Sequence, residues 1–182
     1  LVYMLANALR ASGYTKVEPI AHARTPVIKC VYGATDLDVV VNNGLAVHNT
    51  ALLRAYLDVA DYTRQFIVLV KLWASRRGVN KAAEGTLSSY GHVLSAIHFL
   101  QAGSDPPMLP DLQDESFVAN MPPRVYDGID CRFGDPRSWT PPSFRPGMPK
   151  LLLSYFEYML RYGVPGGEYT LAVRGRGRGK PG

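Results

Sequence analysis

The sequence predicts an α+β fold in which a few strands come first and helices make up most of the rest. Three observations support this prediction. Runs of β-branched and apolar residues occupy 16–20, 26–32 and 37–41, apolar residues recur at helical spacing between 51 and 100, and ten of the fourteen prolines lie in 102–149. We therefore expect strands, then helices, then a long connection.

The N-terminal part is predicted to form one helix and three strands. Val2 to Arg10 is apolar and Ala-rich at helical spacing, and 16–20 and 26–32 have the pattern of paired strands. Leu37 to Val41 is apolar without alternation, which predicts a central strand covered on both faces. Asp38 lies inside this strand, so we expect its carboxylate to have a partner.

Three consecutive helices are predicted next, and each follows a residue that can cap its free N–H groups. They are Ala51–Val59 after Asn49 or Thr50, a longer helix from Asp61 or Thr63 to about Arg77, and a helix from about Ser88 to before Gly103. The longer helix has one apolar stripe that faces a core. Lys71 falls on a different face, together with Arg64 and Ser75.

The C-terminal part is predicted to be a long ordered or partly ordered connection over 102–149 and then a helix over Leu151–Tyr162. Tyr169–Arg174 has the pattern of a strand. The Arg/Gly-rich end from Arg174 has the composition that binds RNA electrostatically.

Composition indicates a globular intracellular chain. The 47% apolar content is enough for a packed core, and a net charge of +5 suits a polyanionic partner without requiring one. Cys30 and Cys131 form no CxxC pair, and the four histidines have no ligand spacing, so we expect neither disulfides nor zinc. No apolar run is long enough to span a bilayer. The sequence starts at Leu1 with no signal-peptide or transit-peptide pattern, so we expect it to be a segment of a longer protein.

The most informative motif is Asp38-Val-Val-Val-Asn-Asn-Gly-Leu-Ala-Val-His-Asn-Thr50, a strand carboxylate followed by a polar turn that opens a helix. Asp36 and Asp38 share one face of the strand, where paired carboxylates can hold divalent metals for phosphoryl transfer. The alternative is an Asp36 at the edge of a turn and a hydrogen-bonded Asp38. Asn42 and Asn43 also fit a turn that tolerates positive φ.

Four blocks of the sequence, in this order, resemble the template-independent RNA nucleotidyltransferases of the polymerase β superfamily: the terminal uridylyltransferases and the poly(A) polymerases with a PAP-associated domain. The blocks are Ala23–Lys29, Asp38–Thr50, Lys71–Arg77 and Gly85–Gly91.

This resemblance implies the last strands of a nucleotidyltransferase palm-like sheet, followed by a mainly helical PAP-associated domain. It places the end of the palm domain at 1–43 and an incomplete helical domain at 44–182, with the Pro-rich connection 102–149 inside it.

The resemblance also implies roles for six residues. Asp38 matches the third catalytic carboxylate and is a candidate metal ligand, which makes Asp36 incidental. Asn43 and Thr50 match contacts to the ribose and base edge of the incoming nucleotide. Lys71 matches the lysine that reaches the triphosphate, and Ser89 matches the serine that contacts its phosphate oxygens. Tyr90 matches the tyrosine whose ring stacks on the base. From the residues alone, Lys71 also fits a solvated lysine, and Tyr90 fits ordinary core packing.

The chain departs from the family in three places. The upstream Gly-Ser helix with its paired aspartates is absent, the position of a second triphosphate lysine is Ser75, and the loop that recognises the base is missing. Base choice is therefore not readable from that loop. The motifs around Asn43 and Ser89 look most like those of uridylyltransferases, including members from kinetoplastid RNA processing.

The implied function is transfer of a nucleoside monophosphate to an RNA 3′ end, with UTP favoured over ATP and with Mg²⁺ or Mn²⁺ as cofactor. The implied partners are an RNA 3′ end and a multi-subunit RNA-processing complex, with no membrane, in the mitochondrion or the cytoplasm, the mitochondrion being slightly favoured. One alternative is a catalytically inactive scaffold subunit of an RNA-processing or ribosome-assembly complex. Another is a regulatory module that binds a nucleotide without transferring it.

Overall fold

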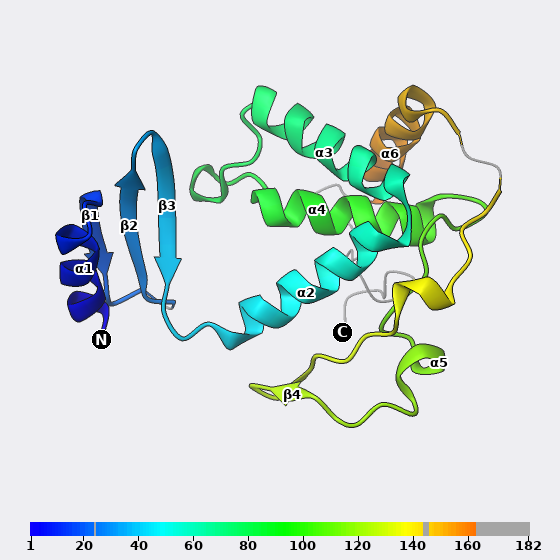
Figure 1. Cartoon of the computed structure of the whole chain (residues 1–182). Helices are drawn as coiled ribbons and strands as arrows, with labels where there is room; N and C mark the ends of the chain where they lie inside the picture. Colours follow the sequence, from blue (N-terminus) through cyan, green and yellow to red (C-terminus); the bar gives the residue numbers. More distant parts are fainter. Residues whose placement is uncertain (24, 144–145, 163–182) are drawn as a thin grey trace, which may run out of the picture. The chain divides into compact units, whose positions relative to one another are not determined.

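The structure is a computed structural model that describes residues 1–23, 25–143 and 146–162 (Figure 1). The predicted strand Tyr169–Arg174 and the Arg/Gly-rich end lie outside these residues. The chain forms two compact units, Leu1–Asn49 and Thr50–Gly182, which are described separately.

The first unit contains one helix and a three-stranded antiparallel sheet in the order β1-β2-β3 (Figure 1). The helix is α1 (Val2–Ala11), and the strands are β1 (Thr15–Ile20), β2 (Val27–Tyr32) and β3 (Thr35–Val40). The predicted helix and the three predicted strands are thus present, with shifts of one or two residues at their ends.

The two faces of this sheet differ. On β2, Ile28 and Cys30 are buried while Lys29 between them is exposed, because successive side chains point to opposite faces of a strand. Ala6 of α1 is also fully buried, and α1 packs against the sheet. One face therefore forms a small core with α1.

The prediction that Leu37–Val41 is a central strand covered on both faces is wrong. Among the described residues β2 is the central strand, β3 pairs only with β2, and the side chains of 35–38 are exposed. Apolar residues without alternation predicted burial, but Leu37 and Val40 remain 36% and 44% exposed. Asp38 consequently faces solvent on an outer strand.

The second unit is mainly helical. Its long helices are α2 (Gly44–Val59, which begins in the first unit), α3 (Asp61–Arg76), α4 (Ser89–His98) and α6 (Met148–Tyr162). A short 3-10 turn η1 (Ala82–Glu84) precedes α4, and a turn of π-helix η2 (Phe99–Gly103) extends it. The order of three strands followed by three long helices is as predicted.

The first helix of this group starts earlier than predicted. The carboxamide Oδ1 of Asn43 accepts a hydrogen bond of 3.1 Å from the backbone N–H of Ala46, so Asn43 caps α2. The predicted caps Asn49 and Thr50 therefore lie inside the helix, because a cap nearer the strand was available.

The Pro-rich connection contains several short elements. Its elements are α5 (Glu115–Val118), the two-stranded hairpin β4 (Val125–Tyr126) and β5 (Ile129–Asp130), and the 3-10 turn η3 (Pro136–Ser138). Asp127 and Gly128 both have positive φ in the hairpin turn, as a two-residue turn of type I′ requires.

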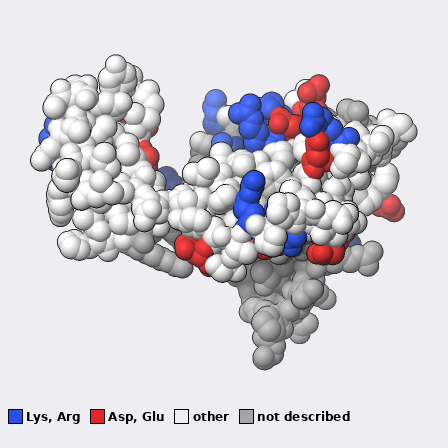
Figure 2. All heavy atoms as spheres, turned by 60° about the horizontal axis from the view of Figure 1, so that its bottom comes forward, with Lys and Arg blue, Asp and Glu red and all other residues white. Residues whose placement is uncertain are grey.

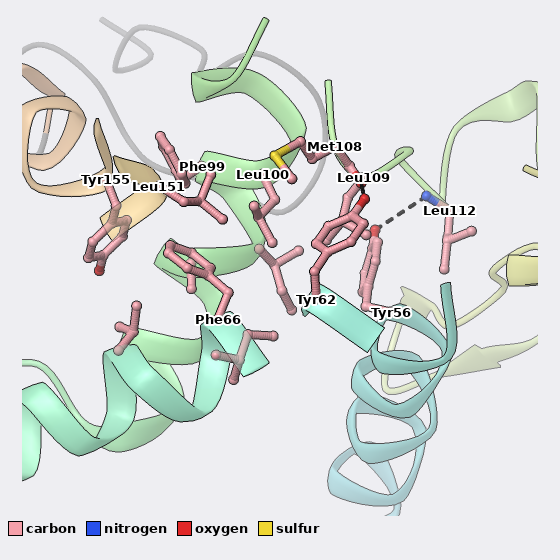
Figure 3. Close-up of a cluster of buried hydrophobic side chains, with 14 of the residues drawn as sticks. Tyr56, Tyr62, Phe66, Phe99, Leu100, Met108, Leu109, Leu112, Leu151 and Tyr155 are labelled. Carbon is pink, nitrogen blue, oxygen red and sulfur yellow. Dashed lines mark hydrogen bonds between the residues drawn. The ribbon is translucent and has the colours of Figure 1, made fainter. Parts of the chain in front are cut away.

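The core of the second unit is built around aromatic rings from three elements. Phe66 of α3, Phe99 of η2 and Tyr155 of α6 lie within 5.7 Å of one another, measured between ring centroids (Figure 3). These residues are at most 1% exposed. Such ring contacts add to the free energy gained by burying the rings.

Tyrosine hydroxyls fasten the start of the connection to this core. The Tyr56 hydroxyl accepts a hydrogen bond from the Leu112 N–H at 3.2 Å (Figure 3). It also accepts one from Gln101 Nε2 at 2.9 Å. The Tyr62 hydroxyl donates to the Met108 carbonyl. Residues 108–112 are therefore held although they form no regular element.

Within the described part of the chain, every helix falls short of the length and apolar character that crossing a bilayer demands.

Candidate functional site

Asp38 lies in an open groove on the exposed face of the first unit's sheet. The groove encloses about 360 Å³ and is lined by charged residues of all three strands. They include Lys16 and Glu18 of β1, Lys29 of β2, and Asp36 and Asp38 of β3. The carboxylate thus stands in a hollow that is open to a ligand.

The hairpin between β2 and β3 determines what lies opposite Asp38. Gly33 has a φ of 62°, which suits the first central position of a tight hairpin turn. The strands pair from Tyr32 and Thr35 next to this turn, so that Lys29 lies directly opposite Asp38. Opposed side chains on one face of an antiparallel pair have Cβ atoms about 4.5–5.5 Å apart. Lys29 is therefore the cation nearest in register to the predicted catalytic carboxylate.

A β-bulge adds a further cation to the groove. The register of β1 shifts between Thr15 and Glu18, and Lys16 has a φ of 49° within this bulge. Such bulges re-aim side chains. Glu18 pairs with Lys29, which gives a row of alternating charge from Glu18 through Lys29 to Asp38.

The groove offers oxygen ligands, which Mg²⁺ and Mn²⁺ prefer. Across the described ranges, however, no three His, Cys, Asp or Glu side chains gather in a way that could hold a metal ion. Asp38 fits the role of one ligand in such a site, but the described residues do not supply a complete set.

Asn42 and Asn43 form the turn after β3. Asn42 has a φ of 57°, as the turn interpretation predicted, and Asn43 caps α2. The cap uses one lone pair of the Asn43 carboxamide oxygen, so the NH₂ group and the second lone pair remain for a ligand. Thr50 lies farther along α2 and is exposed.

Lys71 is exposed on α3, on a face away from the buried stripe that contains Phe66 and Val70. Arg64, two turns earlier on the same face, pairs with Asp58 at 3.7 Å. Among the described residues Lys71 has no acidic group within ion-pair distance. Figure 2 shows Lys and Arg side chains, with Asp and Glu side chains among them, at one edge of the helical unit.

Ser89 and Tyr90 occupy the first turn of α4. The Ser88 hydroxyl caps this helix by accepting the Gly91 N–H at 3.0 Å. The backbone N–H groups of Ser89 and Tyr90 belong to the set that a helix leaves without an internal partner, and such groups favour a bound phosphate. The Tyr90 ring is 44% exposed, and partial burial raises the pKa of its phenol above the ordinary value. Tyr90 is therefore available for stacking and stays neutral.

The loop between α3 and α4 places Ser89 and Tyr90 near the C-terminal end of α3. Gly78, with a φ of 66°, ends α3: its N–H donates to Ser75 and the next N–H, of Val79, donates to Ala74. His92 of α4 contacts the Val79 carbonyl through Nε2 at 2.8 Å. The ring of His92 also packs edge-on against Trp73 of α3, at 6.1 Å between ring centroids.

The predicted residues are divided between the two units. Asp38 and Asn43 belong to the first unit, while Thr50, Lys71, Ser89 and Tyr90 belong to the second. The sequence reasoning missed two neighbours of these residues: Lys29, opposite Asp38, and Asn80, whose side chain contacts Ser89. Counting outward from the Gly33-Ala34 turn would have found Lys29, whereas Asn80 has no signal of this kind.

Comparison with known proteins defines the class to which this fold and these residues belong. The family described as poly(A) RNA polymerase, mitochondrial-like, central palm domain matches residues 2–58. The fold matches Cid1 bound to the UTP analogue UMPNPP with a TM-score of 0.83 and 27% identity, over 98% of this chain and 58% of that chain. A cytoplasmic RNA terminal U-transferase matches with a TM-score of 0.79 and 29% identity, over 96% of this chain and 53% of that one.

Relatives with curated descriptions agree with the structural matches. The poly(A) RNA polymerase GLD2 of Mus musculus is 35% identical over 67% of this chain, and the terminal uridylyltransferase cid1 of Schizosaccharomyces pombe is 36% identical over 68%. The chain spans 26% and 32% of the lengths of these two relatives. It belongs to the RNA 3′-terminal nucleotidyltransferase family that contains these poly(A) polymerases and terminal uridylyltransferases. The predicted family and the predicted fold class are thus confirmed.

Proposed function

We propose that the protein containing this chain adds nucleoside monophosphates to an RNA 3′ end, with UTP as the preferred substrate and ATP as the next candidate. The observation that carries the proposal is the exposed carboxylate of Asp38 in the groove of the sheet, at the position that matches the third catalytic carboxylate. A carboxylate on an open sheet face adds nothing to packing, whereas an RNA 3′-hydroxyl needs a base and a metal beside it.

The helical unit supports the nucleotide side of the reaction. Lys71 has no acidic partner in the part of the chain that the structure describes, and the start of α4 offers backbone N–H groups, the Ser89 hydroxyl and the Tyr90 ring. The lysine, the N–H groups and the hydroxyl can bind a triphosphate, and a base can stack on the tyrosine ring. We assign Lys71 and Ser89 to the triphosphate, Tyr90 to the base, and Asn43 and Thr50 to the ribose and base edge.

A divalent cation, Mg²⁺ or Mn²⁺, would neutralise the triphosphate when bound. Asp38 would provide one of its ligands, as the oxygen donors of the groove permit. Two solved relatives, Cid1 bound to MgGTP and Cid1 bound to Mg 3′-dATP, support the use of a divalent cation.

The preference for UTP rests on the motifs around Asn43 and Ser89, and the relatives include both poly(A) polymerases and uridylyltransferases. A solved relative bound to the short product ApU supports an RNA 3′ end as the acceptor. We also propose an intracellular site of action, because Cys30 and Cys131 are both buried as free thiols.

The test is single-nucleotide addition to a labelled RNA primer by the full-length protein, with each of the four nucleoside triphosphates and with Mg²⁺ or Mn²⁺. We expect addition with UTP above ATP, and its loss in Asp38→Asn. Asp36→Asn is the matched control, because Asp36 lies two residues earlier on the same face of β3 and should tolerate the change. If the intact protein binds nucleotide but adds none, the protein is the regulatory module. If it neither binds nor adds nucleotide, the protein is the inactive scaffold subunit.

A further inference from the structure

Asn80 contacts one of the residues assigned to the triphosphate. Its carboxamide Nδ2 donates a hydrogen bond of 3.2 Å to the Ser89 hydroxyl oxygen. Asn80 lies in the loop between α3 and α4, nine residues before Ser89, and is half-buried. The pair is thus a side-chain contact across the loop, at the first turn of α4.

This contact constrains the hydroxyl proton of Ser89. A serine hydroxyl has one proton to donate and two lone pairs that accept. Because Asn80 supplies a donor, one lone pair is occupied and the proton points in another direction. The direction of Asn80 is therefore closed to the Ser89 proton, which stays available to an acceptor such as a phosphate oxygen.

Asn80 is itself held on both sides. The carbonyl of the preceding Val79 contacts His92 Nε2 at 2.8 Å. The N–H of the following Lys81 donates to the Thr86 hydroxyl at 2.7 Å. These bonds fix the backbone of the loop to α4 and to the residues just before it, so the carboxamide of Asn80 approaches Ser89 from a defined position.

We propose that Asn80 is a positioning residue for nucleotide binding: it orients the Ser89 hydroxyl so that its proton is directed at the triphosphate. The inference rests on the proposed function, because it takes Ser89 as a phosphate contact. It assigns to Asn80 a role without contact to the nucleotide itself.

The test measures the dissociation constant of a non-hydrolysable UTP analogue with the full-length protein and with Asn80→Ala. Because Asn80→Ala removes the effect of one neutral hydrogen bond on nucleotide affinity, we expect binding to be roughly threefold to tenfold weaker. Unfolding temperature is measured beside it, and we expect no change large enough to reduce the folded fraction. Equal affinity in Asn80→Ala and the unchanged protein overturns the proposal.

A double-mutant cycle shows whether Asn80 acts through Ser89. In a Ser89→Ala background, Asn80→Ala should have almost no further effect on the dissociation constant, since the hydroxyl it orients is gone. Fully additive losses would show that Asn80 acts by another route and would overturn the proposal.

Thr86→Val is the matched control for simple bracing of the loop. It removes the hydroxyl that accepts the Lys81 N–H but leaves the contact between Asn80 and Ser89 in place. Because the contact of His92 with the Val79 carbonyl still holds the loop, we expect a smaller loss of affinity than in Asn80→Ala, and an equal or larger loss would assign both effects to the loop and overturn the proposal. If the unchanged protein binds neither the UTP nor the ATP analogue, the proposed function fails, which is a different result from the failure of Asn80 alone.

Discussion

Asp38 is the residue whose catalytic role can be separated most clearly from a role in packing. Its side chain is exposed on the open face of the sheet, where substitutions usually change the free energy of unfolding by no more than about 0.5 kcal/mol. We expect Asp38→Ala to lower the rate of single-nucleotide addition by at least about a hundredfold, the lower range of acid–base contributions. Addition rate and thermal unfolding, measured on the same preparation, check this. Full activity in Asp38→Ala would remove its catalytic assignment.

Tyr90 tests the stacking role at the same scale. Its ring is 44% exposed, so removing it costs the fold little while a stacked base would lose about 1 to 3 kcal/mol. We expect Tyr90→Ala to raise the KM for the nucleotide and Tyr90→Phe to leave it nearly unchanged. Since burial raises the pKa of the Tyr90 phenol, the group stays neutral below that pKa, and the KM should not titrate through Tyr90 between pH 6 and 9. An unchanged KM in Tyr90→Ala would contradict stacking.

At the scale of elements, α2 depends on the residue that precedes it. Asn43 caps this helix through a bond of 3.1 Å to the Ala46 N–H. We expect Asn43→Ala to lower the free energy of unfolding by about 1 kcal/mol, whereas Asn43→Asp keeps a capping oxygen and the stability. Urea unfolding of the two variants checks the cap.

The same pair of variants separates the cap from the nucleotide contact. The Asn43→Asp change removes the NH₂ group, so it should weaken nucleotide binding while stability is retained. If Asn43→Asp binds nucleotide as well as the unchanged protein does, Asn43 serves the helix alone.

The sequence predicted which elements exist better than it predicted their surroundings. Periodicity located α1, α3, α4 and α6 to within a few residues, because each has an apolar stripe that the core requires. It misplaced the start of α2, since several residues there can cap a helix. It also gave β3 a central position, because a short apolar run has the same pattern whether a second sheet neighbour is present or not.

At the scale of the whole molecule, the helical unit depends on the aromatic contacts that join α3, η2 and α6. Phe66 is fully buried and contacts both Phe99 and Tyr155. We expect Phe66→Ala to cost about 3–5 kcal/mol, the range for deleting a buried ring, and Phe66→Leu to cost less. Denaturant unfolding of each variant provides the measurement. A loss below about 1 kcal/mol in Phe66→Ala would show that this cluster is not the centre of stability.

The sequence named the candidate residues but did not show their surroundings. Motif order pointed to Asp38, Lys71, Ser89 and Tyr90, and the structure places each on an exposed surface. What the sequence did not show was the bond from Asn80 to Ser89, because it depends on how the loop folds back on α4. Contacts across a loop follow from its backbone path, and composition does not encode that path.

The tight turn at Gly33-Ala34 restricts how the length of this hairpin can vary between related proteins. Lys29 and Asp38 are the same number of residues from the turn, and neighbouring positions on a strand alternate between the solvent face and the face that packs on α1. One residue lost between Thr35 and Asp38 would turn the carboxylate inward, opposite Cys30, and one residue gained would turn it inward opposite Ile28. Viable homologues should therefore change this strand by two residues at a time, or change the turn itself.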